Sequence, residues 1–148
     1  MSIIIRRLWL AVLLCLTTTV ATAEETPTMT VDQTLLILSS ASPQTQGMAM
    51  VLGNTLASQG TRVRVLLCDQ AGDLALANPP ATVLAPKQVT PAQMLRRLQQ
   101  QGAEVQVCAL YLPNSEHGEE DLAEGVTVAT PPAMASLMRD ARVRVFTF

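Results

Sequence analysis

The sequence is poor in aromatic residues and in histidine, and it contains no block of basic residues. Its aromatic side chains are Trp9, Tyr111, Phe146 and Phe148, and His117 is its single histidine. Proteins that bind single-stranded nucleic acid stack the bases on several rings inside a basic groove. This chain instead has ten basic against twelve acidic side chains, a formal net charge of −2. The sequence therefore predicts no nucleic-acid partner.

Motifs of nucleotide binding and of common catalytic centres are also missing. Residues 39–42 read Ser-Ser-Ala-Ser, where a dinucleotide-binding protein carries glycines, and no Walker A sequence occurs. A serine hydrolase needs a histidine base, and His117 lies in a charged segment of a chain without a nucleophile elbow. No Cys-x-x-Cys pair occurs, and Cys68, Cys108 and His117 lack the spacing of a zinc site. We therefore predict no cofactor and no metal.

The first 23 residues have the organisation of a secretory signal peptide. An arginine pair at positions 6–7 precedes an apolar run over residues 8–16, and an Ala-Thr-Ala cleavage sequence ends at Ala23. The run is too short to span a bilayer, so we expect no stable membrane anchor after cleavage. Cleavage removes two basic and no acidic residues, so the formal charge becomes −4. These features predict a periplasmic protein that keeps two cysteines, Cys68 and Cys108, in an oxidising compartment.

The rest of the chain alternates between strand-like and helix-like segments. Residues 24–33 are a polar, flexible lead-in, and residues 34–148 have the length of one domain. The continuous apolar run 34–38 is typical of a strand buried on both faces of a parallel sheet. The alternation predicts an α/β fold, namely a three-layer α/β/α domain with a mostly parallel five-stranded sheet. The expected strands are 34–38, 62–68, 104–112, 126–128 and 142–148, and the expected helices are 43–59, 90–102 and one that opens at Thr130-Pro131.

Some of these segments carry more specific signals. Residues 90–93, Thr-Pro-Ala-Gln, form a capping box with proline at the first helical position. Residues 69–87 hold several prolines and predict a long loop with a short helix near 74–77, and residues 121–124 predict one helical turn. The helix over 43–59 is expected to face the sheet with one stripe: Met48, Val51, Leu52, Thr55 and Leu56.

Both cysteines of the mature chain are expected near one edge of the sheet. Right-handed crossovers place the carboxyl ends of parallel strands at a common edge, where ligands bind in such folds. Cys68 ends the second expected strand, and Cys108 lies late in the third. If these strands are neighbours, we expect the thiols to be close but not permanently bonded; if the first strand intervenes, they are too far apart to react. Free cysteine is also a common core residue, so an inert role for either is the alternative.

Residues 102–110, with the sequence GAEVQVCAL, resemble the Gly-x-x-φ-x-φ-Cys strand of the DsrE/DsrF-like (DsrEFH-like) sulfur-relay family. Residues 122–126 and the closing segment 143–148 are similar to the same pattern, and the order of elements agrees over 34–148. The resemblance implies a DsrEFH-like fold and a homo-oligomer, which we expect to be a trimer or a multiple of it. In the relay members, the cysteine that matches Cys108 accepts sulfur as a persulfide and passes it on.

Three hypotheses about function follow. The first is a periplasmic sulfur carrier with sulfurtransferase-like or thiol-redox chemistry on Cys108, with Cys68 as the candidate resolving thiol and a donor or acceptor protein or small thiol as partner. The second is a non-catalytic oligomeric binding module. The third is a binder of copper or another soft metal that uses both thiols and a methionine. Tyr111 is expected to pack in the core and is placed to line a pocket beside Cys108, whereas His117 is expected to be an ordinary surface residue.

Overall fold

The computed structural model describes residues 30–148, so the predicted signal peptide and residues 24–29 of the lead-in lie outside the described residues. The elements are β1 Gln33–Leu38, α1 Pro43–Ser58, β2 Arg62–Leu67, the 3₁₀ helix η2 Asp69–Ala75, α2 Pro91–Gln100, β3 Glu104–Val107, the 3₁₀ helices η3 Leu112–Asn114 and η4 Glu119–Asp121, β4 Thr127–Val128, α3 Pro131–Arg139 and β5 Val143–Thr147. The strands form one sheet in the order β4-β3-β2-β1-β5, and every pair is parallel.

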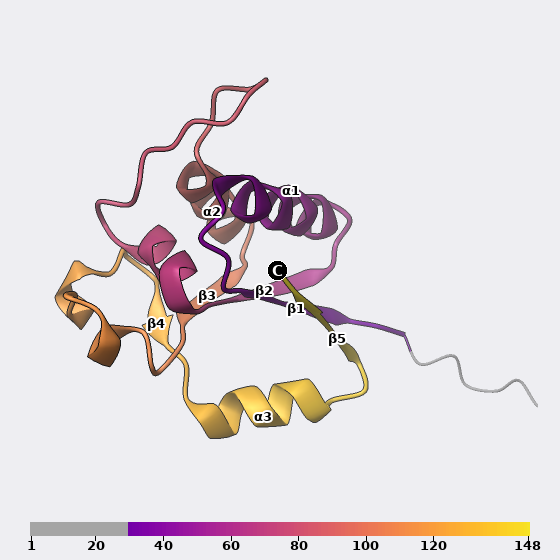
Figure 1. Ribbon diagram of the computed structural model, residues 1–148. Helices are drawn as coiled ribbons and strands as arrows, with labels where there is room; N and C mark the ends of the chain where they lie inside the picture. The colour runs from indigo at the N-terminus through magenta and orange to yellow at the C-terminus, as the bar shows by residue number, and fades with distance from the viewer. Residues whose placement is uncertain (1–29) are drawn as a thin grey trace, which may run out of the picture.

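Helices cover both faces of this sheet. Helices α1 and α2 lie on one face and α3 lies on the other (Figure 1). The predicted three-layer α/β/α architecture is therefore confirmed, with a sheet that is parallel throughout rather than mostly parallel. Strand β1 occupies an inner position and is largely buried along its length, as its continuous apolar run predicted. None of the helices within residues 30–148 is both long enough and apolar enough to cross a lipid bilayer.

Two cores stabilise the layers. Because successive side chains on a strand point to opposite faces, each inner strand contributes to both cores. The core on the α3 side is small: Leu35, Leu66, Ala129 and Met134. The larger core lies between the sheet and helices α1 and α2, and its most completely buried side chains include Leu36, Leu38, Val65, Leu67 and Val107.

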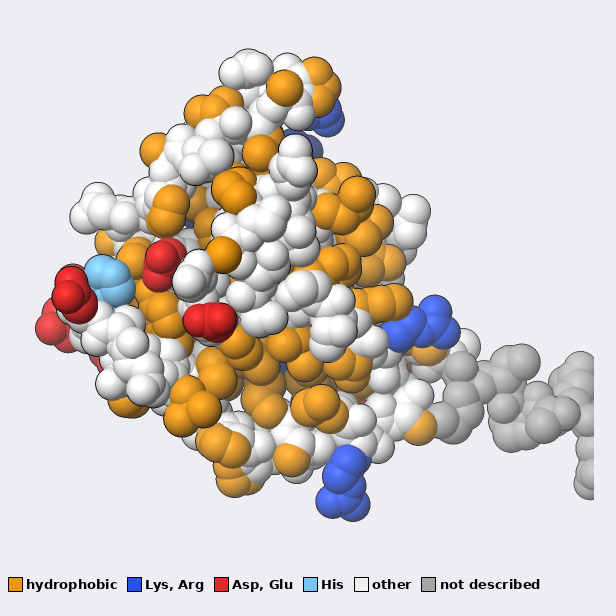
Figure 2. Space-filling model, viewed as in Figure 1, with side chains coloured by type: hydrophobic (Ala, Val, Ile, Leu, Met, Phe, Trp, Pro, Cys, Tyr) orange, Lys and Arg blue, Asp and Glu red, His pale blue; other side chains and the backbone are white. Residues whose placement is uncertain are grey.

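Most of the prediction for the inward face of α1 is wrong, and of the five residues only Leu56 packs against the larger core. Met48, Val51 and Leu52 do not face the sheet; they are 56%, 51% and 43% exposed. The inward face approaches its neighbours closely at Gly53, because a Cβ there would lie 2.9 Å from Leu98 and 3.0 Å from Leu36. This close approach leaves no room for a side chain at that position and turns most of the apolar stripe toward solvent, where hydrophobic side chains are visible over α1 (Figure 2). The buried residues of α1 are Gln46, Gly47, Ala49, Met50 and Gly53.

Several predicted boundaries also differ from the structure. The third strand ends at Val107 instead of residue 112, because its neighbours β2 and β4 provide no ladder partners further along. The short helix in the long loop is η2, which starts directly after Cys68 and not near residue 74. The turn predicted over 121–124 is η4, which lies slightly earlier.

The caps of the two later helices differ in outcome. The Thr90 side chain accepts a hydrogen bond from the Gln93 N–H, and the Gln93 side chain accepts one from the Thr90 N–H, which confirms the capping box. At α3, the Thr130 side chain makes no capping hydrogen bond. Of the two methionines of α3, Met134 is buried and Met138 is exposed.

Candidate functional site

Cys68 and Cys108 lie directly after β2 and β3, at the edge where the strands end. Leu67 is aligned with Val107 in the ladder between these neighbouring strands, so the residues that follow them, the two cysteines, lie side by side. The backbone N–H of Cys68 donates to the Leu38 carbonyl, and that of Cys108 donates to the Leu67 carbonyl, each at 2.8 Å. The strand order thus answers the question that the sequence left open, because the first strand does not separate the cysteines.

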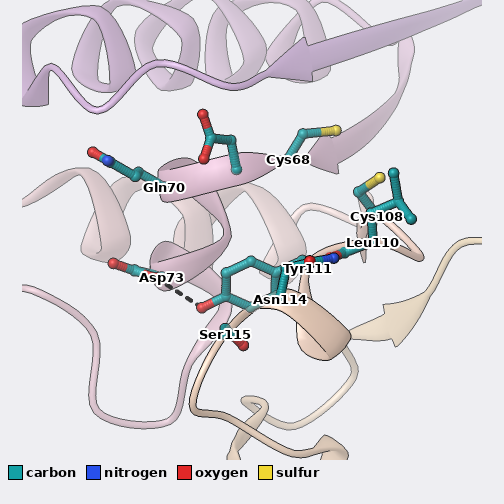
Figure 3. Close-up of a pocket in the computed structure, with 9 residues that line it drawn as sticks. Cys68, Gln70, Asp73, Cys108, Leu110, Tyr111, Asn114 and Ser115 are labelled. Carbon is teal, nitrogen blue, oxygen red and sulfur yellow. Dashed lines mark hydrogen bonds between the residues drawn. The ribbon is translucent and has the colours of Figure 1, made fainter.

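The two thiols also share a face of the sheet. Leu66 is aligned with Gln106 on the α3 side, and residues two positions further along return to that side. The Cys68 thiol hydrogen-bonds to Cys108, both side chains are half-buried, and no disulfide joins them. Figure 3 shows the two sulfur atoms near one another at the end of the sheet. The prediction that Cys108 sits inside a strand is wrong, since it lies just beyond the end of β3.

The thiols open onto a cleft with a volume of about 450 Å³. Its walls come from η2 on one side and from the turn and 3₁₀ helix after β3 on the other (Figure 3). The sequence pointed to the two cysteines and to Tyr111 at this edge, but it gave no signal for the other lining side chains. The lining residues are Cys68, Asp69, Gln70, Asp73, Cys108, Leu110, Tyr111, Asn114 and Ser115.

Tyr111 connects the two walls. Its hydroxyl donates a hydrogen bond to Asp73 Oδ1 at 2.8 Å, and its ring packs on the backbone of Gly72. Burial and the hydrogen bond to Asp73 raise the pKa of Tyr111, so the hydroxyl remains a donor. Tyr111 is buried, as its predicted core role requires, and it also lines the cleft beside Cys108, as its predicted place requires. Since 38 residues separate Tyr111 from Asp73, no local sequence signal indicates this contact.

His117 does not line the cleft. Its Nδ1 lies 3.8 Å from Asp121 Oδ2, and the side chains of both residues are partly exposed. Within residues 30–148, no group of three or more His, Cys, Asp or Glu side chains is arranged to hold a metal ion.

The environment of Cys68 disfavours its thiolate. Burial is the largest cause, followed by the charge of Cys108, the hydrogen bond to it and the charge of Asp69; together they raise the pKa of Cys68 to about 12. Because the thiolate is the reactive form of cysteine, Cys68 remains a protonated thiol at neutral pH. The two neighbouring thiols therefore differ in role: Cys68 donates a hydrogen bond and Cys108 accepts it.

We expect Cys68 in the Cys108→Ala variant to react faster with iodoacetamide at mildly alkaline pH than Cys68 in the wild type. The substitution removes two of the causes that raise the pKa of Cys68, so the thiolate fraction rises at a given pH. Peptide mass spectrometry over a series of pH values measures the alkylation rate at this residue. Cys108→Ser is the control for altered access, because serine nearly keeps the volume of cysteine without its charge. Identical pH profiles for Cys68 in all three proteins would contradict the coupling.

The fold around this site has known structural counterparts. No family model matches the sequence, and no curated protein matches it. The chain shares its α/β fold with two solved structures. The structure of the ychN protein from E. coli is similar with a TM-score of 0.61 and 22% identity, covering 78% of this chain and 99% of that one. MTH1491, a protein of unknown function from Methanobacterium thermoautotrophicum, is similar with a TM-score of 0.62 and 13% identity, covering 78% and 98%. At these identities the similarity concerns the fold alone.

Proposed function

We propose that this chain is a sulfur carrier that holds a sulfane sulfur as a persulfide on Cys108, in the periplasm to which its predicted signal peptide would direct it. The observation that carries this proposal is the pair of free thiols, side by side, at an open cleft on the carboxyl edge of a parallel sheet. Ligands of open α/β sheets bind at this edge. The resemblance of residues 102–110 to the relay strand supports Cys108 as the carrier.

Loading of the carrier is an exchange between sulfur atoms. The Cys108 thiolate attacks the outer sulfur of a donor R–S–SH. A new S–S bond forms between Cys108 Sγ and that sulfur, so Cys108 becomes a persulfide. The S–S bond of the donor breaks, and its inner sulfur leaves as R–S⁻ with the electron pair and then takes a proton from solvent. No external oxidant or reductant is needed, and the donor is a protein or a small thiol in its persulfide form.

Cys68 has two functions in this scheme. As a protonated thiol it donates a hydrogen bond to the sulfur of Cys108. As a thiolate it attacks Cys108 Sγ, which gives a Cys68–Cys108 disulfide and releases HS⁻. Because the pKa of Cys68 is raised to about 12, the second reaction is slow at neutral pH. A persulfide on Cys108 therefore persists long enough to be passed on.

The direct test is to incubate protein purified after expression of the full chain with a persulfide donor and to measure its intact mass. We expect an increase by the mass of one sulfur atom, which disappears on treatment with dithiothreitol and maps to the peptide that contains Cys108. A protein whose mass does not change with any persulfide donor, while both thiols remain free, would refute the carrier function.

We propose second that the chain self-associates, as the resemblance implies. The supporting observation is the exposed apolar stripe on α1, formed by Met48, Val51 and Leu52. Exposed apolar residues in a cluster are typical of protein–protein contacts, and closed symmetric assemblies are the common form of homo-oligomers. Self-association is also what the hypothesis of a non-catalytic oligomeric binding module requires.

Light scattering at micromolar concentration is expected to give the mass of a trimer or of a multiple of it. Val51→Glu is expected to reduce this mass to that of the monomer, because a charge in an apolar contact is unfavourable. Gln100→Glu, at an exposed position of α2, is the control for a charge added outside the stripe. A monomeric wild-type protein would contradict the assembly.

A further inference from the structure

We infer that the thiol cleft selects its sulfur donors and acceptors by charge, accepting cationic and uncharged molecules and discriminating against anionic ones. This inference rests on the proposed function, because it concerns the substrates of the same pair of thiols. It is carried by the chemistry of the side chains that line the cleft and by the distribution of charge around it.

The charges in the cleft have one sign. Asp69 and Asp73 line it, and no Lys, Arg or His is among the lining residues. Both carboxylates belong to η2, which begins directly after Cys68. The Asp69 charge reaches the thiols, because it is one of the causes that raise the pKa of Cys68. A donor that carries a carboxylate or sulfonate would therefore bring a fourth negative group beside the two carboxylates and the attacking thiolate.

The surroundings of the cleft add to this charge. Residues 116–124 follow Ser115, a lining residue, and contain five acidic side chains and no Lys or Arg. Arg64 and Arg142, by contrast, are each paired with a carboxylate, Glu104 at 2.8 Å and Asp140 at 2.9 Å, toward the amino ends of the strands. In Figure 2 the acidic side chains gather on one side of the molecule and the basic ones lie elsewhere on its outline. Because no basic side chain lines the cleft, the charge of its carboxylates is not offset there.

The size of the effect follows from Coulomb's law. For unit charges about 7 Å apart in a half-exposed cleft, the interaction corresponds to roughly a threefold to tenfold change in rate for each charge on the donor. Since the cleft is open to solvent, this discrimination decreases as salt screens the charges.

The test compares three symmetric disulfides: cystamine, which is cationic; 2-hydroxyethyl disulfide, which is neutral; and 3,3′-dithiodipropionate, which is anionic. The Cys108 thiolate attacks one sulfur of the probe, a mixed disulfide forms, the S–S bond of the probe breaks, and one thiolate leaves with the electron pair. The Cys68→Ser variant is used because the reaction then stops at the mixed disulfide. Each rate is divided by the rate of the same probe with 2-mercaptoethanol, a neutral thiol, to remove differences in intrinsic reactivity.

We expect the normalised rates to follow the order cationic, neutral, anionic at low salt and to converge at high salt. Asp69→Asn is expected to reduce the difference between the normalised rates of the cationic and the anionic probe. The substitution is suited to this position because Asp69 has a φ of +48°, in the left-handed region that asparagine also tolerates. Asp32→Asn removes one charge from an exposed residue directly before β1, at the edge of the sheet opposite the cleft, and is expected to have little effect.

The outcomes separate this inference from the proposed function. Equal normalised rates, or a faster anionic probe, would overturn the charge selection even if the wild-type protein loads sulfur from a neutral persulfide. A protein that follows the expected charge order with disulfides but gains no sulfur from a neutral persulfide would retain the charge selection and lose the carrier function. If Asp69→Asn and Asp32→Asn narrowed the difference between the probes equally, the effect would be one of net charge, and a selection made in the cleft would be overturned.

Discussion

Cys108→Ser is expected to abolish sulfur loading, whereas Cys68→Ser is expected to load sulfur and to hold it longer than the wild type. A serine hydroxyl is not ionised at neutral pH, so the first substitution lowers the loading rate by at least about 100-fold. Cys68 does not replace the lost nucleophile, because burial, the largest cause of its raised pKa, and the charge of Asp69 still disfavour its thiolate. Removal of Cys68 prevents the slow attack on Cys108 Sγ that releases HS⁻.

Two measurements distinguish the thiols in these variants. Intact mass after incubation with a persulfide donor reports loading, and the release of sulfide over time reports resolution. In the wild type, release is expected to accelerate as the pH rises toward the pKa of Cys68, because more of this thiol is then ionised. A Cys108→Ser variant that loads sulfur as fast as the wild type would refute the assignment of the carrier residue. Equal sulfide release with and without Cys68 would refute its resolving role.

Gly72→Ala is expected to destabilise the protein and to open the wall of the cleft. A Cβ at this position would overlap the ring of Tyr111. The φ of Gly72 is not positive, so the backbone conformation itself does not strain an alanine, and the clash with the ring is the cause of the effect. Overpacking of this kind typically costs about 1–3 kcal/mol. The ring has to move, which breaks the hydrogen bond between Tyr111 and Asp73.

Chemical denaturation of Gly72→Ala, of Tyr111→Leu and of the double variant measures this clash. Because the leucine side chain does not reach as far as the tyrosine ring, the double variant is expected to lose less unfolding free energy than the sum of the two single losses. Tyr111→Phe is the control, since it removes the hydrogen bond to Asp73 and keeps the ring. A Gly72→Ala variant with wild-type stability would show that the packing of the Tyr111 ring does not require a glycine at position 72.

The order of the elements could be predicted because its signals are local. The apolar run over residues 34–38 indicated a strand buried on both faces, and the capping box at Thr90 marked the start of a helix; both hold in the structure. The same kind of reasoning failed for α1, where the hydrophobic stripe of Met48, Val51 and Leu52 faces solvent. Periodicity indicates which residues share a helix face, but the close packing of Gly53 decides which face is buried.

By itself, the sequence determined the α/β class, the parallel sheet and the edge at which the cysteines lie. These properties follow from segment length, apolar spacing and the handedness of crossovers, which depend on neighbouring residues. Only the tertiary structure decided that β2 and β3 are adjacent, that Cys68 and Cys108 share a face, and that the hydroxyl of Tyr111 reaches Asp73. Strand order and contacts between distant segments result from the joint packing of all layers, so no short stretch of sequence encodes the cleft that these residues form.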